Sequence, residues 1–589
     1  MPMTGLKFSG AAAYFLTCAV FATPTLFASG EAADLPPAPP SAERLHPTAE
    51  EKPRPTAELH TRIDELVATA QPAFAELAGE LCTDAEFIRR VYLDLTGCIP
   101  PADVVREFLA DETPSTEKRT ALVDRLLDTP EHARRLQYVF DEMLMERRGG
   151  NNVPDAAWKD YLFQSFRANK PWDQLVSEIL AADGADEELR AAAKFYLDRN
   201  FEIDVVTRDI GRVFLGVDLE CAQCHDHPVI DDYLQAHYYG LSAFLRRSYL
   251  FTDPKSKQKM LGEKAEGEVK FTSVFTGEEG QTDPRLLEMP EVPDPEGMEE
   301  AYIVAPEKTV RGVPKYSRRK RLAEVMISTE NTAFRRNIVN RLWAVMMGRG
   351  LVEPLDMRHA ENPPSHPELL AFLGEEFTGH GYDIRFLLRE IALSQTYQRT
   401  SRVADETAEA ARDALAVSRL KPLSAEQLAR SMLRATGTAD RLLAARVAEE
   451  IKSDAENGPQ RVEDAAWREA AFNAAAQPML DQFAARFAGL GGQRTAFDAT
   501  AAQALFLENG SQMQGWLVPQ GENLTARVIA LEDAPAIADE LYMNILSRPP
   551  TGEETVEIEA YLNLVHDRTA AVQEIAWALL SSAEFRFNH

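Results

Sequence analysis

Amphipathic helix patterns occupy most of the chain after residue 58, and they predict a predominantly helical fold. The clearest pattern covers residues 83–97, where Thr83 is suited to the N-cap, Glu86 follows at the third helical position and Gly97 ends the run. The apolar residues of this segment that share one helix face are Phe87, Val91 and Leu95. A second such pattern covers residues 365–381.

In residues 365–381, Ser365 is the predicted N-cap, Glu368 completes a capping box and Gly381 ends the helix. The two prolines just before this segment predict a sharp entry from a loop into the helix.

One stretch, residues 250–314, departs from the helical pattern. It is rich in Gly, Pro, Lys and Glu, and short alternating runs at 268–275 and 301–305 predict a few strands. Helical patterning returns at 316–328. We therefore predict a mostly α protein with two helical domains joined by a small β-containing middle segment. The predicted bounds are 58–248 for the first domain, 249–315 for the middle segment and 316–589 for the second domain.

The first residues of the chain have the character of an export signal. Lys7 supplies the positive flank, residues 11–28 form the apolar segment and small residues follow it. We predict a signal peptide over 1–30 and a Pro-rich tether over 31–57. No later segment has eighteen consecutive apolar residues, so no transmembrane anchor is expected after the signal is removed. The predicted location is periplasmic, cell-surface or extracellular.

The charge balance argues against nucleic acid as a partner. The formal net charge is −30, which repels a phosphate backbone, and no basic stripe with interleaved aromatic residues offsets it. The densest basic run, "RRKR" at 318–321, begins a predicted helix, and we expect it to form a solvated helix face.

The stretch "CAQCHDHP" at 221–228 is the strongest functional signal. Cys221, Cys224 and His225 form Cys-x-x-Cys-His, the attachment signature of c-type haem, in which two thiols form thioethers and the histidine is an axial ligand. Asp226 is expected to orient these ligands. The sequence thus predicts one haem c for electron transfer or oxidation.

Other interpretations of the same residues stay open. Zinc, or iron without haem, would use the two cysteines with His225 or His227 and would need a distant further ligand. Cys221 and Cys224 could also form a disulfide in an exported protein. In these cases the protein would be a cell-surface binding or scaffold protein with a structural site. The sequence leaves open whether the protein is an enzyme, and it names neither a redox partner nor a cell-surface component.

A haem iron with two protein ligands needs a second axial residue, and three candidates are weighed. His237 lies in the helix after the motif, Met289 in a loop and His366 at the start of a helix. Each has an ordinary structural interpretation, and none is singled out.

The remaining two cysteines after signal removal, Cys82 and Cys98, flank the predicted helix at 83–97. A fifteen-residue helix spans ~22 Å. A disulfide requires a Cα separation of only ~4–7 Å. Two free, buried thiols are therefore favoured over a bridge.

Several motifs resemble those of a family of secreted planctomycete proteins. They are "FIRRVYLDLTGCIPP", "VFLGVDLECAQCHDHP", "NIVNRLWAVMMGRGLVEPLDMRHAENPPSHPELLAFLGEEF" and "ALLSSAEFRFNH", and they occur in order over residues 60–589. The family pairs a planctomycete cytochrome-C-like domain of unknown function with a second planctomycete domain of unknown function. The resemblance implies a haem-like site at Cys-x-x-Cys-His, but it brings no defined reaction. This chain departs from the family pattern at His237, which stands where an acidic residue is usual.

Overall fold

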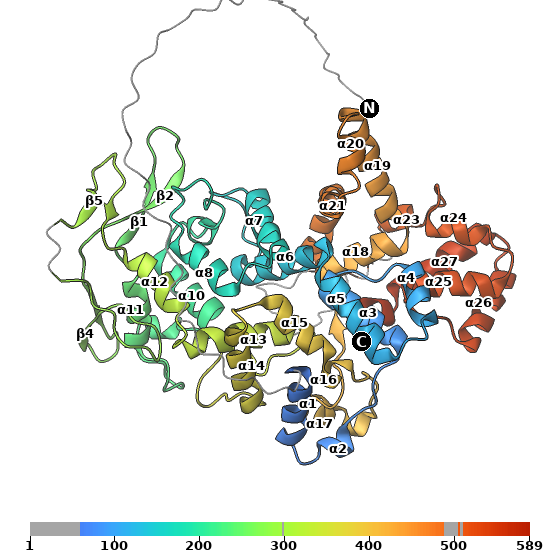
Figure 1. Cartoon of the computed structure of the whole chain (residues 1–589), viewed down its shortest axis with the longest axis horizontal. Helices are drawn as coiled ribbons and strands as arrows, with labels where there is room; N and C mark the ends of the chain where they lie inside the picture. The colour runs from blue at the N-terminus through green and yellow to red at the C-terminus, as the bar shows by residue number, and fades with distance from the viewer. Residues whose placement is uncertain (1–58, 297–299, 488–502, 504, 507–509) are drawn as a thin grey trace, which may run out of the picture. The chain divides into compact units, whose positions relative to one another are not determined.

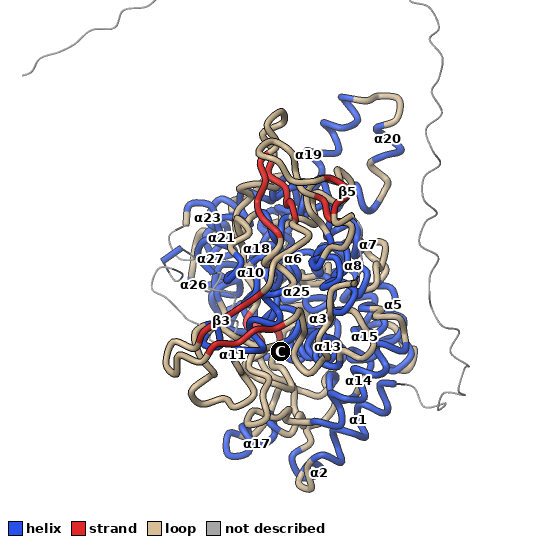
Figure 2. Tube along the Cα trace, turned by 90° about the vertical axis from the view of Figure 1, so that its left-hand side faces the viewer, coloured by secondary structure: helices blue, strands red, loops and turns tan. Residues whose placement is uncertain are grey.

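The computed structural model describes residues 59–296, 300–487, 503, 505, 506 and 510–589. The predicted signal peptide and tether lie outside these residues. The predicted fold class is confirmed, because the described chain is mostly helical and its strands form only two-stranded sheets (Figures 1 and 2). None of the helices in the described residues combines the length and apolarity needed to cross a bilayer.

The helices that precede the middle segment pack with the first helices that follow it around one large group of buried apolar side chains, here named the first core. These helices are α1 (Leu59–Ala70), α2 (Phe74–Leu77), α3 (Asp84–Thr96), α4 (Ala102–Ala110), α5 (Ser115–Leu127), α6 (Pro130–Met145), α7 (Asp155–Arg167), α8 (Trp172–Ala181), α9 (Lys194–Leu197), α10 (Ile203–Ile210), α11 (Gln235–Ala243), α12 (Arg318–Met326), α13 (Thr332–Met347), α14 (Pro367–Gly379), α15 (Ile384–Leu393), α16 (Gln395–Gln398) and α17 (Ala408–Asp413). Aromatic residues are prominent in this core: the indole of Trp172 on α8 stacks on the ring of Phe334 on α13 at a centroid distance of 6.1 Å.

The later helices bury a separate group of apolar side chains, the second core. They are α18 (Ala425–Ala435), α19 (Thr438–Ser453), α21 (Ala465–Phe487), α23 (Ser511–Leu517), α24 (Leu524–Ile529), α25 (Ala534–Ile545), α26 (Gly552–Leu564), α27 (Arg568–Ser581) and α28 (Ala583–Arg586). The short helix α20 (Gly458–Arg461) contributes no side chain to this core. The predicted domain bounds stay a prediction, since α12 to α15 share the first core with the N-terminal helices.

Helix α3 belongs to both cores. The predicted face with Phe87 and Val91 lies in the first core, as expected, whereas Leu93 lies in the second. Arg89, also on α3, is buried and donates hydrogen bonds to the carbonyl oxygens of Ile545 at 3.2 Å and Phe585 at 2.9 Å. Burial lowers the pKa of Arg89 to about 10. A helix that appears amphipathic from its sequence therefore connects the two halves of the described chain.

Thr83 is the N-cap of α3, as predicted, and its hydroxyl accepts a hydrogen bond from the amide of Glu86 at 3.2 Å. The carboxylate of Glu86 does not complete a capping box but pairs with Arg90 at 2.6 Å. Gly97 ends the helix in the left-handed conformation, as predicted, with φ of 72°. The flanking Cys82 and Cys98 are free and buried, in agreement with the separation argument.

The prediction for the start of the helix at 365–381 was wrong by one residue. Helix α14 begins at Pro367, and His366 rather than Ser365 occupies the N-cap position. The reason is that proline is well suited to the first helical position, where its missing N–H is not needed.

The expectation of a solvated basic run at 318–321 was also wrong in part. Arg318 and Arg319 are buried. Arg318 pairs with Asp294 at 2.8 Å. Arg319 donates to the carbonyl oxygen of Ala182, which follows the end of α8, at 3.0 Å. A cation is stabilised there because the C-terminal carbonyl groups of a helix carry partial negative charge.

The middle segment forms three antiparallel hairpins, and the two predicted strands are confirmed as β3 and β5. Figure 2 shows β3 beside α11. The pairs are β1 (Ser248–Thr252) with β2 (Lys259–Glu263), β3 (Val269–Thr272) with β4 (Glu279–Thr282) and β5 (Tyr302–Val304) with β6 (Val313–Pro314). A further short pair, β7 (Lys421–Pro422) with β8 (Phe587–Asn588), joins segments far apart in the sequence.

His132 on α6 predicts an acid sensitivity of the fold. It is fully buried, its Nδ1 donates to the carbonyl oxygen of Leu95 at 2.9 Å, and burial lowers its pKa to about 4. The unfolded chain binds more protons than the native chain between about pH 6.5 and pH 4, so stability falls as the pH falls through this range. We expect His132 to contribute a loss of about 2–4 kcal/mol at pH 4.

Urea unfolding at a series of pH values checks this expectation. The variant His132→Asn keeps a donor for Leu95 but does not titrate. Its free energy of unfolding is expected to depend less on pH below 6.5 than that of the wild type. Parallel profiles for the two proteins would contradict the assignment.

Candidate functional site

The chain reaches the Cys-x-x-Cys-His motif through a distorted end of α10. A π-helical turn, η1 (Gly211–Leu215), follows α10, and Gly216 then ends it in the left-handed conformation with φ of 70°. Gly211 lies so close to the next segment that a Cβ there would approach the carbonyl oxygen of Val217 to 3.0 Å. This geometry turns the chain sharply and presents Cys221–Gln223 as a single 3₁₀ turn, η2. Residues 221–237 are named the motif loop below.

Cys221 and Cys224 are both free and exposed, in contrast to the buried pair on either side of α3. His225 is half-buried, and its Nδ1 lies 2.6 Å from the carbonyl oxygen of Asp226. A carbonyl only accepts, so in the neutral tautomer that fits this contact Nδ1 carries the proton and Nε2 keeps its lone pair. Metal-bound histidines commonly have this arrangement, because the hydrogen bond of one ring nitrogen selects the tautomer that leaves the other free.

His227 has the opposite tautomer, set by its own backbone contacts. Its Nδ1 accepts hydrogen bonds from the amides of Val229 at 3.2 Å and Ile230 at 2.9 Å. Its own amide donates to the carbonyl oxygen of Tyr233 at 2.8 Å. In the neutral ring Nε2 therefore carries the proton. His227 closes the motif loop much as an Asx turn does.

Asp226 and His237 connect the motif loop to α11. The carboxylate of Asp226 accepts a hydrogen bond from the amide of Gln235, the first residue of that helix, at 2.7 Å. His237 is half-buried, and its Nδ1 lies 2.9 Å from the carbonyl oxygen of Asp232. Burial lowers the pKa of His237. Asp226 therefore positions the loop against the helix.

Apolar side chains from the middle segment stand beside the motif. The amide of Val274, in the turn between β3 and β4, donates to the carbonyl oxygen of Cys224 at 3.1 Å. The ring of the next residue, Phe275, lies 4.6 Å from that of His225. Both side chains are largely exposed, at 69% for Val274 and 79% for Phe275. Exposed aromatic and branched side chains next to two free thiols and a histidine form an apolar environment at the surface.

The other side of the motif loop contacts a segment from beyond the middle segment, residues 358–362. The hydroxyl of Tyr233 donates to the carbonyl oxygen of Arg358 at 3.0 Å. The carboxylate of Asp232 accepts from the amide of Ala360 at 2.5 Å. The ring of His359 meets that of Tyr233 edge to face at 5.9 Å. Sequence reasoning missed these contacts, because nothing in the spacing of "RHAEN" links it to a cysteine motif 130 residues earlier.

The two other ligand candidates belong to separate segments of the chain. Met289 is half-buried and packs against the first core. His366 is buried at the start of α14, and burial lowers its pKa. Its Nδ1 lies 3.1 Å from the hydroxyl of Ser365, and its Nε2 has no hydrogen-bond partner within the described part of the chain.

Within the described ranges, no group of three or more His, Cys, Asp or Glu side chains is arranged to hold a metal ion. The donor set of the motif is instead one that suits haem c. A haem needs two accessible thiols, an imidazole nitrogen with a free lone pair and apolar cover. Cys221, Cys224 and His225 meet the first two needs, and Val274 with Phe275 supplies apolar surface next to them. The residues present fit the group.

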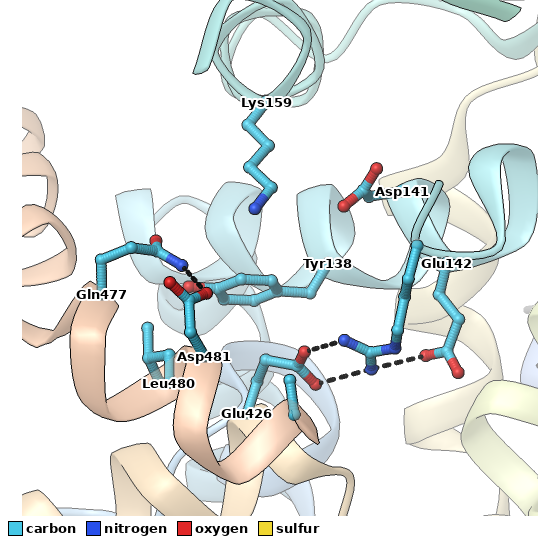
Figure 3. A pocket seen from close by; sticks show the side chains of 10 residues that line it. Tyr138, Asp141, Glu142, Lys159, Glu426, Gln477, Leu480 and Asp481 are labelled. Atoms are coloured by element: carbon cyan, nitrogen blue, oxygen red, sulfur yellow. Dashed lines mark hydrogen bonds and ion pairs between the residues drawn. The ribbon is translucent and has the colours of Figure 1, made fainter. Parts of the chain in front are cut away.

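A separate pocket lies where α6 meets α18 and α21 (Figure 3). Arg147 lines it and pairs with Glu426 at 2.5 Å and with Glu142 at 3.5 Å. Lys159 reaches in from α7 (Figure 3). Asp141 at its edge accepts the indole N–H of Trp158 at 2.8 Å, and burial raises its pKa. The pocket contains none of the motif residues, and its Arg147–Glu426 ion pair joins the end of α6 to α18.

The assignment of His227 as a loop-closing residue makes a local prediction. His227→Ala leaves the amides of Val229 and Ile230 without their acceptor, and we expect it to destabilise the motif loop by about 1–2 kcal/mol. His227→Asn places an acceptor where Nδ1 stands and is expected to change little. His227→Gln places its acceptor one atom further out and is expected to behave like the alanine variant.

Amide hydrogen exchange at Val229 and Ile230 measures this effect directly. Faster exchange in the alanine and glutamine variants, with protection retained in the asparagine variant, is the expected pattern. Equal protection in all three variants would contradict the role of Nδ1.

The fold and site define a helical protein that presents a Cys-x-x-Cys-His turn at its surface, with the turn held between a β hairpin and a segment of the second half. Comparison with protein families agrees with this description. PSCyt2, a protein of unknown function (DUF1549), matches residues 62–249, and PSD1, a protein of unknown function (DUF1553), matches residues 318–562. The chain belongs to the planctomycete family that carries these two domains in this order, which confirms the resemblance seen in the sequence. No curated protein and no solved structure matches the chain.

Proposed function

We propose that the protein is an exported cytochrome-c-like redox protein that binds one haem c through Cys221 and Cys224, with His225 as an axial ligand. The observation that carries the proposal is the conjunction of two exposed free thiols with an imidazole whose Nδ1 is bonded to a backbone carbonyl. The proposed location is the periplasm, cell surface or extracellular space, where covalent haem attachment occurs.

The residues of the chain have distinct tasks in this proposal. Nε2 of His225 offers the axial lone pair, and the carbonyl of Asp226 keeps the ring in the required tautomer. His227 stabilises the turn that follows the motif, because its Nδ1 accepts the amides of Val229 and Ile230. Val274 and Phe275 offer exposed apolar surface beside the motif, against which one edge of a haem would pack. When bound, haem supplies a one-electron couple at this surface.

The test is the visible spectrum and the intact mass of the protein exported by a host that matures c-type cytochromes. We expect a haem spectrum and a mass increase of one haem that survives denaturation, because thioether bonds are covalent. A colourless protein of unmodified mass from such a host would defeat the proposal.

A second candidate, a cell-surface binding or scaffold protein, is supported by one observation. The motif loop contacts both the β3–β4 turn and residues 358–362, so a structural role for it is consistent with its place between separate parts of the chain. In that case Cys221 and Cys224 form a disulfide or hold zinc or iron without haem. Thiol alkylation before and after reduction, together with metal analysis, identifies which of these applies.

A further inference from the structure

The motif loop lies in a part of the sequence whose charged residues are all acidic. Residues 213–245 contain no lysine or arginine, although they contain five carboxylates. Two of these, Asp218 and Glu220, pair with Arg208 at 2.7 Å and 2.8 Å. The other three, Asp226, Asp231 and Asp232, are exposed and are in no ion pair within the described residues.

Neighbouring segments add carboxylates of the same kind. Glu278 and Glu279 follow Phe275 in the hairpin, and Glu361 follows Ala360, whose amide bonds to Asp232. All three glutamates are exposed and have no ion-pair partner in the described part of the chain. The basic residues in the same segments are already engaged, since Lys270 lies 3.4 Å from Glu268 and Arg358 lies 2.9 Å from Glu288.

Exposed apolar side chains belong to the same segments as these carboxylates. Val229 is 69% exposed and Leu234 is 37% exposed, and both belong to the motif loop. Val274 and Phe275 contact Cys224 and His225, as described above. Protein interfaces typically have an apolar centre and a polar, charged rim, and charge in the rim steers the encounter of the two partners.

We propose that this surface docks a partner protein that presents an apolar contact face surrounded by lysine and arginine. The acidic rim consists of Asp226, Asp231, Asp232, Glu278, Glu279 and Glu361, and the apolar centre consists of Val229, Leu234, Val274 and Phe275. The inference extends the proposed function, because the partner would exchange electrons at the motif. The charge complementarity itself does not depend on haem.

The test uses the full exported chain and a basic mitochondrial-type cytochrome c as the probe, with an acidic plant-type ferredoxin as the comparison probe. Binding is measured by calorimetry at ~10 mM salt, where the Debye length is about 30 Å, and at ~1 M salt, where it is about 3 Å. We expect the basic probe to bind at low salt only and the acidic probe not to bind.

The rim is tested by a triple variant, Asp231→Asn, Glu279→Gln and Glu361→Gln, whose carboxylates make no hydrogen bond within the described residues. The matched control is Glu553→Gln, Glu557→Gln and Glu559→Gln on α26, which changes the net charge equally at an exposed surface elsewhere. We expect the rim variant to raise the Kd for the basic probe about tenfold or more and the control variant to raise it less than about twofold.

The apolar centre is tested by Val229→Ser against Val556→Ser, a residue on α26 with a similar exposure of 63%. We expect about a threefold weakening for the first and no change for the second. Equal effects of the rim and α26 variants, or no binding of the basic probe, would overturn the docking surface. Equal effects would mean that only the net charge of the whole chain attracts the probe.

Failure of the docking surface and failure of the haem proposal give different results. The double variant Cys221→Ser with Cys224→Ser cannot attach haem, yet it keeps the rim and is expected to bind the probe as the wild type does. A colourless wild type that binds through the rim would defeat the haem proposal and leave the docking surface standing. A haem-containing wild type that binds the probe equally well with and without the rim carboxylates would overturn the docking surface and leave the haem proposal standing.

Discussion

Replacing Asp94 by asparagine is expected to lower the free energy of unfolding by about 3–5 kcal/mol, because it leaves a buried ammonium without its counter-ion. Asp94 lies on α3 and is 4% exposed. Its carboxylate accepts hydrogen bonds from Lys421 at 2.5 Å, the hydroxyl of Tyr397 at 2.8 Å and the side-chain amide of Asn588 at 2.9 Å. Four distant segments therefore meet at one carboxylate.

Two further variants separate the charge from the packing. Adding Lys421→Met to Asp94→Asn removes the second charge while keeping a side chain of similar length, and we expect it to recover much of the lost stability. The control Glu65→Gln breaks the exposed pair with Arg62 and is expected to change stability by less than about 0.5 kcal/mol. The measurement is chemical unfolding followed by circular dichroism.

The pH dependence of the single variant gives an independent check. Burial lowers the pKa of Lys421 to about 8, and the loss of Asp94 lowers it further. Between the native pKa and about 10.4, the unfolded chain binds more protons than the native chain. The Asp94→Asn variant is therefore expected to regain stability as the pH rises through this range. A variant as stable as the wild type at pH 7 would show that the carboxylate does not compensate Lys421.

The second large effect concerns cofactor attachment. The double variant Cys221→Ser with Cys224→Ser is expected to abolish covalent haem entirely, and each single variant is expected to leave at most one thioether. His225→Ala is expected to keep the thioethers but to change the spectrum of the iron, because the axial nitrogen is lost. Because both thiols are exposed, the double variant is expected to change the free energy of unfolding of the apoprotein by less than about 0.5 kcal/mol.

Cys82→Ser supplies the matched control for this series. Cys82 is buried in the first core, so a hydroxyl there is expected to destabilise the fold by about 1–3 kcal/mol. Its effect on haem attachment is expected to be nil. Intact mass with pyridine haemochrome spectroscopy measures attachment, and chemical unfolding measures the loss of stability. Attachment that survives the loss of Cys221 and Cys224 would place the cofactor elsewhere.

Helical periodicity predicted the fold class because a 3.6-residue repeat of apolar side chains has one main structural solution. The same periodicity did not predict which faces would meet. The sequence pattern did not indicate that Leu93 belongs to a different core from Phe87 and Val91 on the same helix. Burial of Arg318 was missed for a similar reason, since its partner Asp294 lies in an irregular segment with no periodic pattern.

The sequence by itself determined the local chemistry of the candidate site: two thiols and an imidazole within five residues, and a helix that begins soon after them. Only the tertiary structure decided the tautomers of His225 and His227, because each depends on which backbone group lies beside Nδ1. It also decided that Phe275 and Tyr233 join the motif to other parts of the chain. Covalent spacing is a property of neighbours in sequence, whereas hydrogen-bond partners and apolar cover come from segments that meet only when the chain folds.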